Sequence, residues 1–202
     1  MKHRQNIYAC YDKMLGRQEK EDFLKQHSRV VWLTGLSSSG KSTIAFGVEK
    51  ELAANGFFTQ VLDGDNIRSG INNNLGFSPE DRYENIRRIS EVSRLFLNCG
   101  IICINSFISP TREMRSLARN IIGPENMIEV YVKAPLEVCE KRDTKGLYKK
   151  ARAGEISDFT GIDSPYEAPE NPDITVDTEH LSAEECIKKC TDYILPLVTY
   201  KT

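Results

Sequence analysis

The segment GLSSSGKST at residues 35–43 constrains the fold of this chain more than any other feature. It fits the pattern G-x-x-x-x-G-K-[ST] and directly follows the apolar run VVWLT at 30–34. In such a loop the glycines let the backbone curl, so that successive N–H groups point at phosphate oxygens and the following helix adds its positive end. Because the loop lies between a strand-like run and a helical pattern, the sequence predicts a nucleoside triphosphate site.

Individual positions of this loop have expected roles. Lys41 should reach the β- and γ-phosphates, and the Ser42 hydroxyl should be a ligand for magnesium. The loop residues expected to bind ATP are Gly35, Leu36, Ser37, Ser38, Ser39, Gly40, Lys41, Ser42 and Thr43.

Apolar runs alternate with helical patterns along the rest of the chain. Strands are expected at 30–34, 57–62, 101–107, 127–132 and 173–176, and helices at 42–55, 79–99, 111–122, 135–142 and 182–195. This alternation predicts an α/β fold of the three-layer P-loop NTPase type, with a doubly wound, mostly parallel sheet of about five strands. Such sheets bind ligands beyond the carboxyl ends of their strands.

Composition excludes some classes of function. With a net charge of -2 there is no electrostatic case for nucleic-acid binding. No apolar run approaches the length of a membrane span, and the first twenty residues contain no apolar signal core, so we expect a cytoplasmic protein. The six cysteines lack C-x-x-C spacing and nearby histidines, which favours reduced, mostly buried thiols over a redox-active pair.

Two aspartates follow the second expected strand, in the stretch LDGDNIR. The third strand ends INSFIS without the acid found there in most NTPases of this class. A carboxylate of Asp63 or Asp65 can orient magnesium or accept the proton of an attacking hydroxyl, although an acidic surface turn is the alternative. The chain has no N-K-x-D element for reading guanine, which argues against a switch GTPase.

A long segment at 143–172 interrupts the alternation of strands and helices. It has little apolar periodicity and many lysines, arginines and glycines. Loops of this length in a compact domain are usually functional lids or disordered segments. We expect a mobile lid at about 143–163, with a solvated basic segment as the alternative.

Four blocks of the sequence together resemble the adenylylsulfate kinase (APS kinase) family, from about Val30 to the C-terminus. They are GLSSSGKST, LDGDNIRSGINNNLGFSPEDRYENIRR, SFISP and KGLYKKARAGEISDFTGIDSPYEAPE. The resemblance implies transfer of the γ-phosphoryl of ATP to the 3′-hydroxyl of adenosine 5′-phosphosulfate (APS). The products are 3′-phosphoadenosine 5′-phosphosulfate and ADP, in sulfate assimilation. It also implies magnesium as cofactor and a homodimer.

The same resemblance assigns the remaining site residues. Lys41, Asp63 and Ser109 would be catalytic, Ser42 and Asp63 would hold the metal, and Arg142 would cover the adenine of ATP. The residues implied to bind APS are Asp65, Arg68, Phe77, Arg82, Asn85, Ile108, Ser109, Lys145 and Phe159. This fits their chemistry, since arginine forks suit the phosphosulfate and aromatic rings suit the adenine.

Ser109 has two possible roles. Bacterial members are often described with a phosphoserine at this position, but no base lies near Ser109 in the sequence, and direct in-line transfer needs only positioning and charge neutralisation. We therefore interpret Ser109 first as an acceptor-site residue and second as a covalent carrier.

The chain departs from the family at two places. Ser38 stands where relatives often have glycine, and a positive φ there would cost serine about 1 kcal/mol. The first 29 residues follow the family only loosely, which suggests a partly helical extension at 1–29 before the kinase-like domain at 30–202. The chain contains no sulfurylase-like block, so the bifunctional synthase of animals is not expected.

Two other functions stay open at this point. One is a different small-molecule kinase with the same loop, and the other is a catalytically silent nucleotide-binding regulator. Intact Lys41, Ser42 and Asp63 argue against the silent protein.

Overall fold

The computed structural model describes Tyr8 and residues 10–200 of the chain. Its centre is a five-stranded sheet in the order β2-β3-β1-β4-β5, with all neighbouring strands parallel. The strands are β1 Val30–Thr34, β2 Thr59–Asp63, β3 Ile102–Ser106, β4 Met127–Lys133 and β5 Ile174–Asp177. The expected fold class is therefore confirmed.

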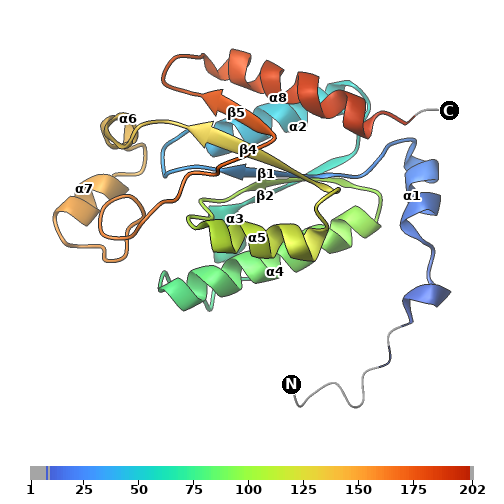
Figure 1. Ribbon diagram of the computed structural model, residues 1–202, viewed down its shortest axis with the longest axis horizontal. Coiled ribbons are helices and arrows are strands. Elements are labelled where there is room, and N and C mark those ends of the chain that lie inside the picture. Colours follow the sequence, from blue (N-terminus) through green and yellow to red (C-terminus); the bar gives the residue numbers. More distant parts are fainter. Residues whose placement is uncertain (1–7, 9, 201–202) are drawn as a thin grey trace.

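Helices cover both faces of this sheet (Figure 1). The described helices are η1 Tyr11–Lys13, α1 Arg17–Leu24, α2 Lys41–Ala54, α3 Gly64–Ser69, α4 Pro79–Asn98, α5 Arg112–Ile122, α6 Leu136–Arg142, α7 Leu147–Arg152 and α8 Ala183–Val198. Helices α2 and α8 pack on one face, and α4 and α5 on the other, each pair over its own apolar core. Every residue of β1 and β3 is buried, as expected for strands covered on both sides. None of the described helices is long and apolar enough to cross a membrane.

Local capping explains where the long helices begin. Ser78 accepts a hydrogen bond from the Asp81 amide at 3.2 Å, and Pro79 occupies the first position of α4, as predicted. In α8, Ser182 and Glu185 form a reciprocal capping box. These signals lie within four residues of each helix start, which is why the sequence located them well.

Two short helices were not expected. Helix α3 follows β2 directly because the Asp63 carboxylate accepts the Asp65 amide at 3.1 Å and so caps it. Helix α7 lies inside the segment expected to be a lid, where the Asp143 carboxylate accepts the amides of Tyr148 and Lys149 at 3.1 and 3.0 Å. Helices of six residues show too little periodicity to be recognised in a sequence.

The lid segment also has a small apolar core, in which the buried residues are Ala134, Cys139, Tyr148, Ala151 and Phe159. It lies beyond the carboxyl ends of the strands, whereas α1 lies at the opposite end of the molecule (Figure 1). The segment is thus a folded unit in this structure, and its mobility stays a prediction.

Helix α1 is joined to the amino end of the sheet by a polar network. Arg17 donates to the Glu21 and Asn126 side chains at 2.7 Å each, and Glu21 accepts the Ser28 amide at 2.8 Å. Burial raises the pKa of Glu21, but the hydrogen bonds from Ser28, Arg17 and His27 outweigh it and lower the value to about 2. Within the expected extension at 1–29, residues 11–13 and 17–24 are helical, and residues 1–7 and 9 lie outside the described part. The extension as a unit and its boundary at residue 30 stay predictions.

Candidate active site

A cleft of about 800 Å³ opens at the carboxyl ends of the strands. Its walls are the 37–43 loop, the end of β2 with α3, the start of α4, the end of β3 and the lid segment. The predicted site residues that line it are Ser37, Ser38, Gly40, Lys41, Ser42, Thr43, Asp63, Asp65, Arg68, Phe77, Arg82, Asn85, Ile108, Ser109, Lys145 and Phe159.

The phosphate-binding loop needs its two glycines for different reasons. A Cβ on Gly35 would lie 2.5 Å from the Val132 carbonyl oxygen, so a side chain there would push the loop off β4. Gly40 has a φ of 102°, which an L side chain rarely adopts. Gly35 is thus required by the close approach of β4, and Gly40 by the conformation of its own backbone.

Ser38 has the positive φ that the sequence analysis considered, at 58°. Neighbouring contacts hold this part of the loop, because the Tyr148 hydroxyl donates to the Ser37 carbonyl at 3.0 Å and Thr178 donates to the Ser39 carbonyl at 2.9 Å. Contacts from the lid and from the residue after β5 therefore hold the loop on both sides of the strained backbone at Ser38.

Lys41 is held by the loop itself. Its ammonium group donates to the Leu36 carbonyl at 2.7 Å, and the residue is only 8% exposed. Burial lowers the pKa of Lys41 to about 8. A triphosphate bound in the loop would raise this pKa again, because its negative charge would stabilise the ammonium form.

Three side-chain oxygens meet where the loop faces the sheet. The Ser42 hydroxyl donates to the Asp63 carboxylate at 2.7 Å and lies 3.3 Å from the Ser106 hydroxyl. Asp63 and Ser106 are partners in the pairing of β2 with β3, so both strands deliver an oxygen to the same point. Ser106 was not among the predicted site residues, although it stands at the end of β3, in the place of the absent acid.

Two arginines and an aromatic ring form the opposite wall. The Arg68 and Arg82 guanidinium carbons lie 4.5 and 5.8 Å from the centre of the Phe77 ring, which is 58% exposed. Arg68 donates to the Gly76 carbonyl at 2.7 Å, and Arg82 donates to the Thr160 hydroxyl at 2.7 Å. Arg82 thus connects α4 to the lid segment, which its sequence position did not indicate.

The lid supplies two of the predicted acceptor-site residues. Lys145 forms an ion pair with Asp65 across the cleft. Phe159 is 9% exposed and packs edge-on against Tyr148, with ring centres 5.0 Å apart. Phe159 therefore belongs to the small lid core and also borders the cleft, while Phe77 is the more open of the two predicted adenine contacts.

Ser109 is fixed by contacts from three sides. Its hydroxyl accepts from the Trp32 indole at 3.1 Å, and its carbonyl accepts from Arg115 at 2.8 Å. The preceding carbonyl, of Ile108, accepts from Thr34 at 2.7 Å, and Ser109 itself has a φ of 40°. A buried hydroxyl that accepts from an indole favours the interpretation of Ser109 as an acceptor-site residue over that of a covalent carrier.

The cleft wall omits four predicted ATP-site residues, namely Gly35, Leu36, Ser39 and Arg142. Gly35 and Ser39 are buried, and Leu36 packs against the small lid core. Arg142 lies outside, where it donates to the Thr178 hydroxyl at 2.9 Å and to the Thr178 carbonyl. That position borders the loop and is compatible with a contact to an adenine lying outside the cleft.

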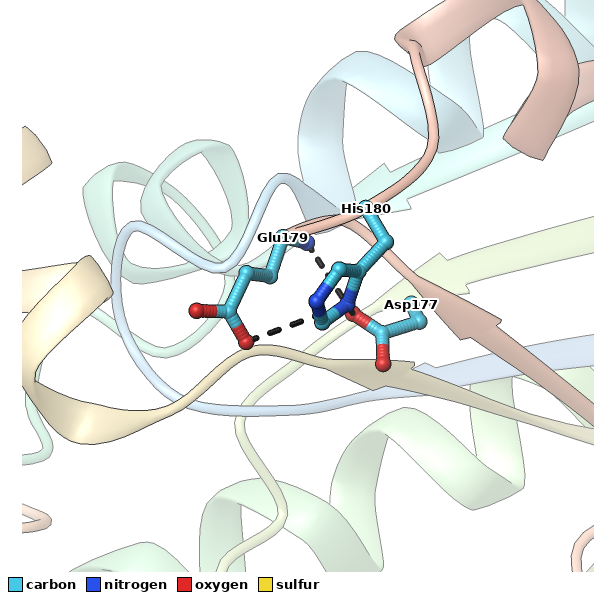
Figure 2. A group of neighbouring side chains, drawn as sticks. All are labelled: Asp177, Glu179 and His180. Carbon is cyan, nitrogen blue, oxygen red and sulfur yellow. Dashed lines mark hydrogen bonds and ion pairs between the residues drawn. The ribbon is translucent and has the colours of Figure 1, made fainter.

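Near this point, a second polar group follows β5 (Figure 2). Asp177 accepts from Lys133 at 3.0 Å and from the Glu179 amide at 3.1 Å, and its carboxylate lies 3.3 Å from the His180 ring. The Asp177, Glu179 and His180 ligand atoms are close enough to share an ion, but Lys133 already neutralises the carboxylate. We interpret the group as the turn that ends β5.

Comparison with known proteins agrees with this geometry. A family model described as adenylylsulphate kinase matches residues 27–177, which include every segment that lines the cleft. The adenylyl-sulfate kinase of Bacteroides thetaiotaomicron is 56% identical over 201 residues, 100% of each chain, and that of Phocaeicola vulgatus is 57% identical over 197 residues, 98% of this chain and 97% of the relative.

A solved structure gives a similar result. The Mycobacterium tuberculosis APS kinase, determined in complex with AMPPNP and APS, is 47% identical to this chain and superposes with a TM-score of 0.81. The match covers 84% of this chain and 98% of that one.

Proposed function

Because the chain belongs to the adenylylsulfate kinase family, as its motifs predicted, we propose that it transfers the γ-phosphoryl of ATP to the 3′-hydroxyl of APS. The products would be 3′-phosphoadenosine 5′-phosphosulfate and ADP. The relatives at 56% and 57% identity are named adenylyl-sulfate kinase, and the match covers almost the whole length of each of them.

The observation that carries the proposal is the two-sided cleft. The phosphate-binding loop with Lys41 forms one wall, and Arg68, Arg82 and Phe77 form the other. A donor with several phosphates suits the first wall, because backbone amides and a lysine surround phosphate oxygens there. An acceptor with an anion and a flat base suits the second wall, because two guanidinium groups flank an exposed ring.

Ser42 and Asp63 would hold Mg²⁺. Their oxygens lie 2.7 Å apart, and carboxylate and hydroxyl oxygens are the ligands that this hard cation prefers. When bound with ATP, the ion would neutralise charge on the transferring phosphoryl group.

Asp63 has a second expected role toward the acceptor. Its buried carboxylate lies at the end of β2 and lines the cleft. From there it would orient the 3′-hydroxyl or accept its proton as transfer proceeds. Lys41 would exchange its contact with the Leu36 carbonyl for the phosphates.

The lid segment would exclude water. A kinase must keep water away from the in-line position, and closing a segment over the cleft does so. The Lys145–Asp65 pair and the Arg82–Thr160 bond already bridge the cleft in this structure. We expect hydrogen exchange across residues 145–160 to slow when APS and nucleotide are both bound. Equal protection with and without ligands would identify a rigid loop.

A substrate panel tests the proposed function. The purified chain is mixed with ATP and Mg²⁺, and ADP formation is followed with APS, with 3′-deoxy-APS, with gluconate and without acceptor. Only APS should stimulate ADP formation, and mass spectrometry should find one added phosphoryl group on APS. Stimulation by another acceptor would favour a different small-molecule kinase, and no turnover with any acceptor would favour a silent nucleotide-binding protein.

Assembly and cellular location form separate parts of the proposal. We expect a cytoplasmic homodimer. Sedimentation of the purified chain should give about twice the mass of one chain, and a mass that stays monomeric at working concentration would contradict this. Cell fractionation tests the location.

A further inference from the structure

The side-chain amide of Asn85 presents its nitrogen, and not its oxygen, to the cleft. Asn85 lines the cleft and is only 4% exposed. Its Oδ1 accepts from Asn72 Nδ2 at 2.9 Å. Among the described residues, no partner is found for its own Nδ2, and that nitrogen is not one of the fully buried unpartnered atoms. The nitrogen therefore faces the cleft and is available as a donor.

An arginine sets this direction from outside the cleft. Arg88 Nη1 lies 3.4 Å from Asn72 Oδ1 and 2.9 Å from Asn74 Oδ1. A guanidinium group can only donate, so it requires the oxygen of Asn72 to face it. The nitrogen of Asn72 must then face Asn85, and Asn85 in turn directs its oxygen to Asn72 and its nitrogen to the cleft.

The orientation of the Asn72 amide is set by its protein contacts and not by solvent. Asn72 has no exposed surface, so water cannot replace its partners. It lies in the turn after α3, held by the bond from its amide to the Ile67 carbonyl at 3.0 Å. Its side chain bridges that turn to α4, where both Asn85 and Arg88 are located.

We propose that Asn72 is a positioning residue that orients the Asn85 amide as a hydrogen-bond donor toward the anion or ribose oxygens of the acceptor. This inference rests on the proposed function, since APS is taken as the acceptor. The ligand atoms that would benefit are oxygens, which accept hydrogen bonds from an amide nitrogen but are repelled by an amide oxygen. Asn72 would thus contribute to acceptor binding although it does not itself line the cleft.

One substitution at position 72 reverses the direction of the hydrogen bond to Asn85 without changing the size of the side chain. Asn72→Asp replaces the donor toward Asn85 with a carboxylate that only accepts, and Arg88 can still pair with it. The Asn85 amide would then rotate, donate to Asp at position 72 and present its oxygen to the cleft. Asn74→Asp is the matched control, because it makes the same change on another partner of Arg88 that does not contact Asn85.

Steady-state kinetics with ATP and APS measure the effect. We expect Asn72→Asp to raise KM for APS about 10- to 100-fold, in line with losing a hydrogen bond to a charged group, and to leave KM for ATP within about twofold. Asn74→Asp should change both constants less than about twofold. Equal losses in the two variants, an unchanged KM for APS in Asn72→Asp, or an equal loss of ATP affinity would each overturn the proposal.

A second variant and a direct measurement complete the test. If Asn72→Asp does not fold, Asn72→Ser is used, whose hydroxyl can donate or accept, and KM for APS should rise about threefold to tenfold; no change would overturn the proposal. Neutron diffraction from crystals of the parent and Asn72→Asp should find the Asn85 amide in opposite orientations. That readout needs no turnover, so it separates a wrong orientation mechanism from a wrong proposed function, which the parent chain's own activity with APS decides.

Discussion

The two walls of the cleft are built in different ways. The donor wall comes from one continuous segment, the phosphate-binding loop, of which residues 37, 38 and 40–43 line the cleft. The acceptor wall combines α3, the start of α4, the 106–110 loop and the lid, which are separated by up to about ninety residues in the chain. A local motif can therefore report the donor reliably, whereas the acceptor depends on how distant segments pack.

The walls also differ in what holds their positive charges. Lys41 is buried and, without ligand, donates to the Leu36 carbonyl of its own loop. Arg68 and Arg82 are partly exposed and bond carbonyls of neighbouring segments, and Arg82 also bonds Thr160 of the lid. Substitutions on the donor wall should therefore affect chemistry most, and substitutions on the acceptor wall should affect binding most.

The largest expected effect is that of Lys41→Ala. We expect the lysine to contact the transferring phosphoryl group most directly, so kcat should fall by at least about a hundredfold, equivalent to about 2.7 kcal/mol of barrier. The fold should persist, because the one side-chain hydrogen bond of Lys41 found among the described residues goes to the Leu36 carbonyl of its own loop. Turnover assays and circular dichroism measure the two. If the variant kept more than about a tenth of the parent kcat, the donor wall would not affect chemistry more than the acceptor wall does.

Arg82→Ala should have the next largest effect, and it should fall on the acceptor. Losing one guanidinium contact to an anion should raise KM for APS about 10- to 100-fold and leave the ATP affinity within about threefold. Arg68→Ala should do the same more weakly, since it does not bond the lid. Calorimetry with APS and with a non-hydrolysable ATP analogue measures both affinities.

Arg87→Ala is the matched control for these arginines. Arg87 lies on α4, as Arg82 does, and it pairs with Glu84, but it does not line the cleft. Its replacement should leave both affinities unchanged. If Arg82→Ala instead weakened ATP more than APS, the arginines would belong to the donor wall.

A moderate effect is expected from pH on ATP binding. Burial lowers the pKa of Lys41 to about 8, and the negative charge of a bound triphosphate should raise it again. Binding therefore takes up a proton above pH 8, and ATP affinity should fall about tenfold between pH 7 and pH 9, while below pH 7 this group contributes no slope. Calorimetry in buffers of different ionisation enthalpy measures the uptake. Lys41→Met should remove it, and an equal uptake in that variant would assign it to another group.

The smallest effect should come from Ser38→Gly. Glycine relieves the positive φ at Ser38 but loses more backbone entropy on folding, so unfolding free energy should change by less than about 1 kcal/mol, with kcat unchanged. Gly35→Ala is the opposite control and should destabilise the loop clearly, because its Cβ would meet the Val132 carbonyl. Urea unfolding measures both. A loss above about 1 kcal/mol in Ser38→Gly would mean that the serine side chain supports the loop.

The sequence by itself determined the parallel sheet, the main helices and the donor loop. These depend on apolar periodicity, capping residues such as Ser78 and glycines such as Gly40, all of which act within a few positions along the chain. The family resemblance added the acceptor residues as a set, but without their contacts.

Only the tertiary structure decided how those residues are supported. It placed Ser106 beside Asp63, buried the Ser109 hydroxyl under Trp32 and linked Arg82 to Thr160. These contacts join residues that are between 43 and 78 positions apart in the chain. The residues adjacent in sequence to either partner therefore do not predict the contact. The direction of the Asn85 amide is of the same kind, because it follows from a bond between two elements and not from the residue itself.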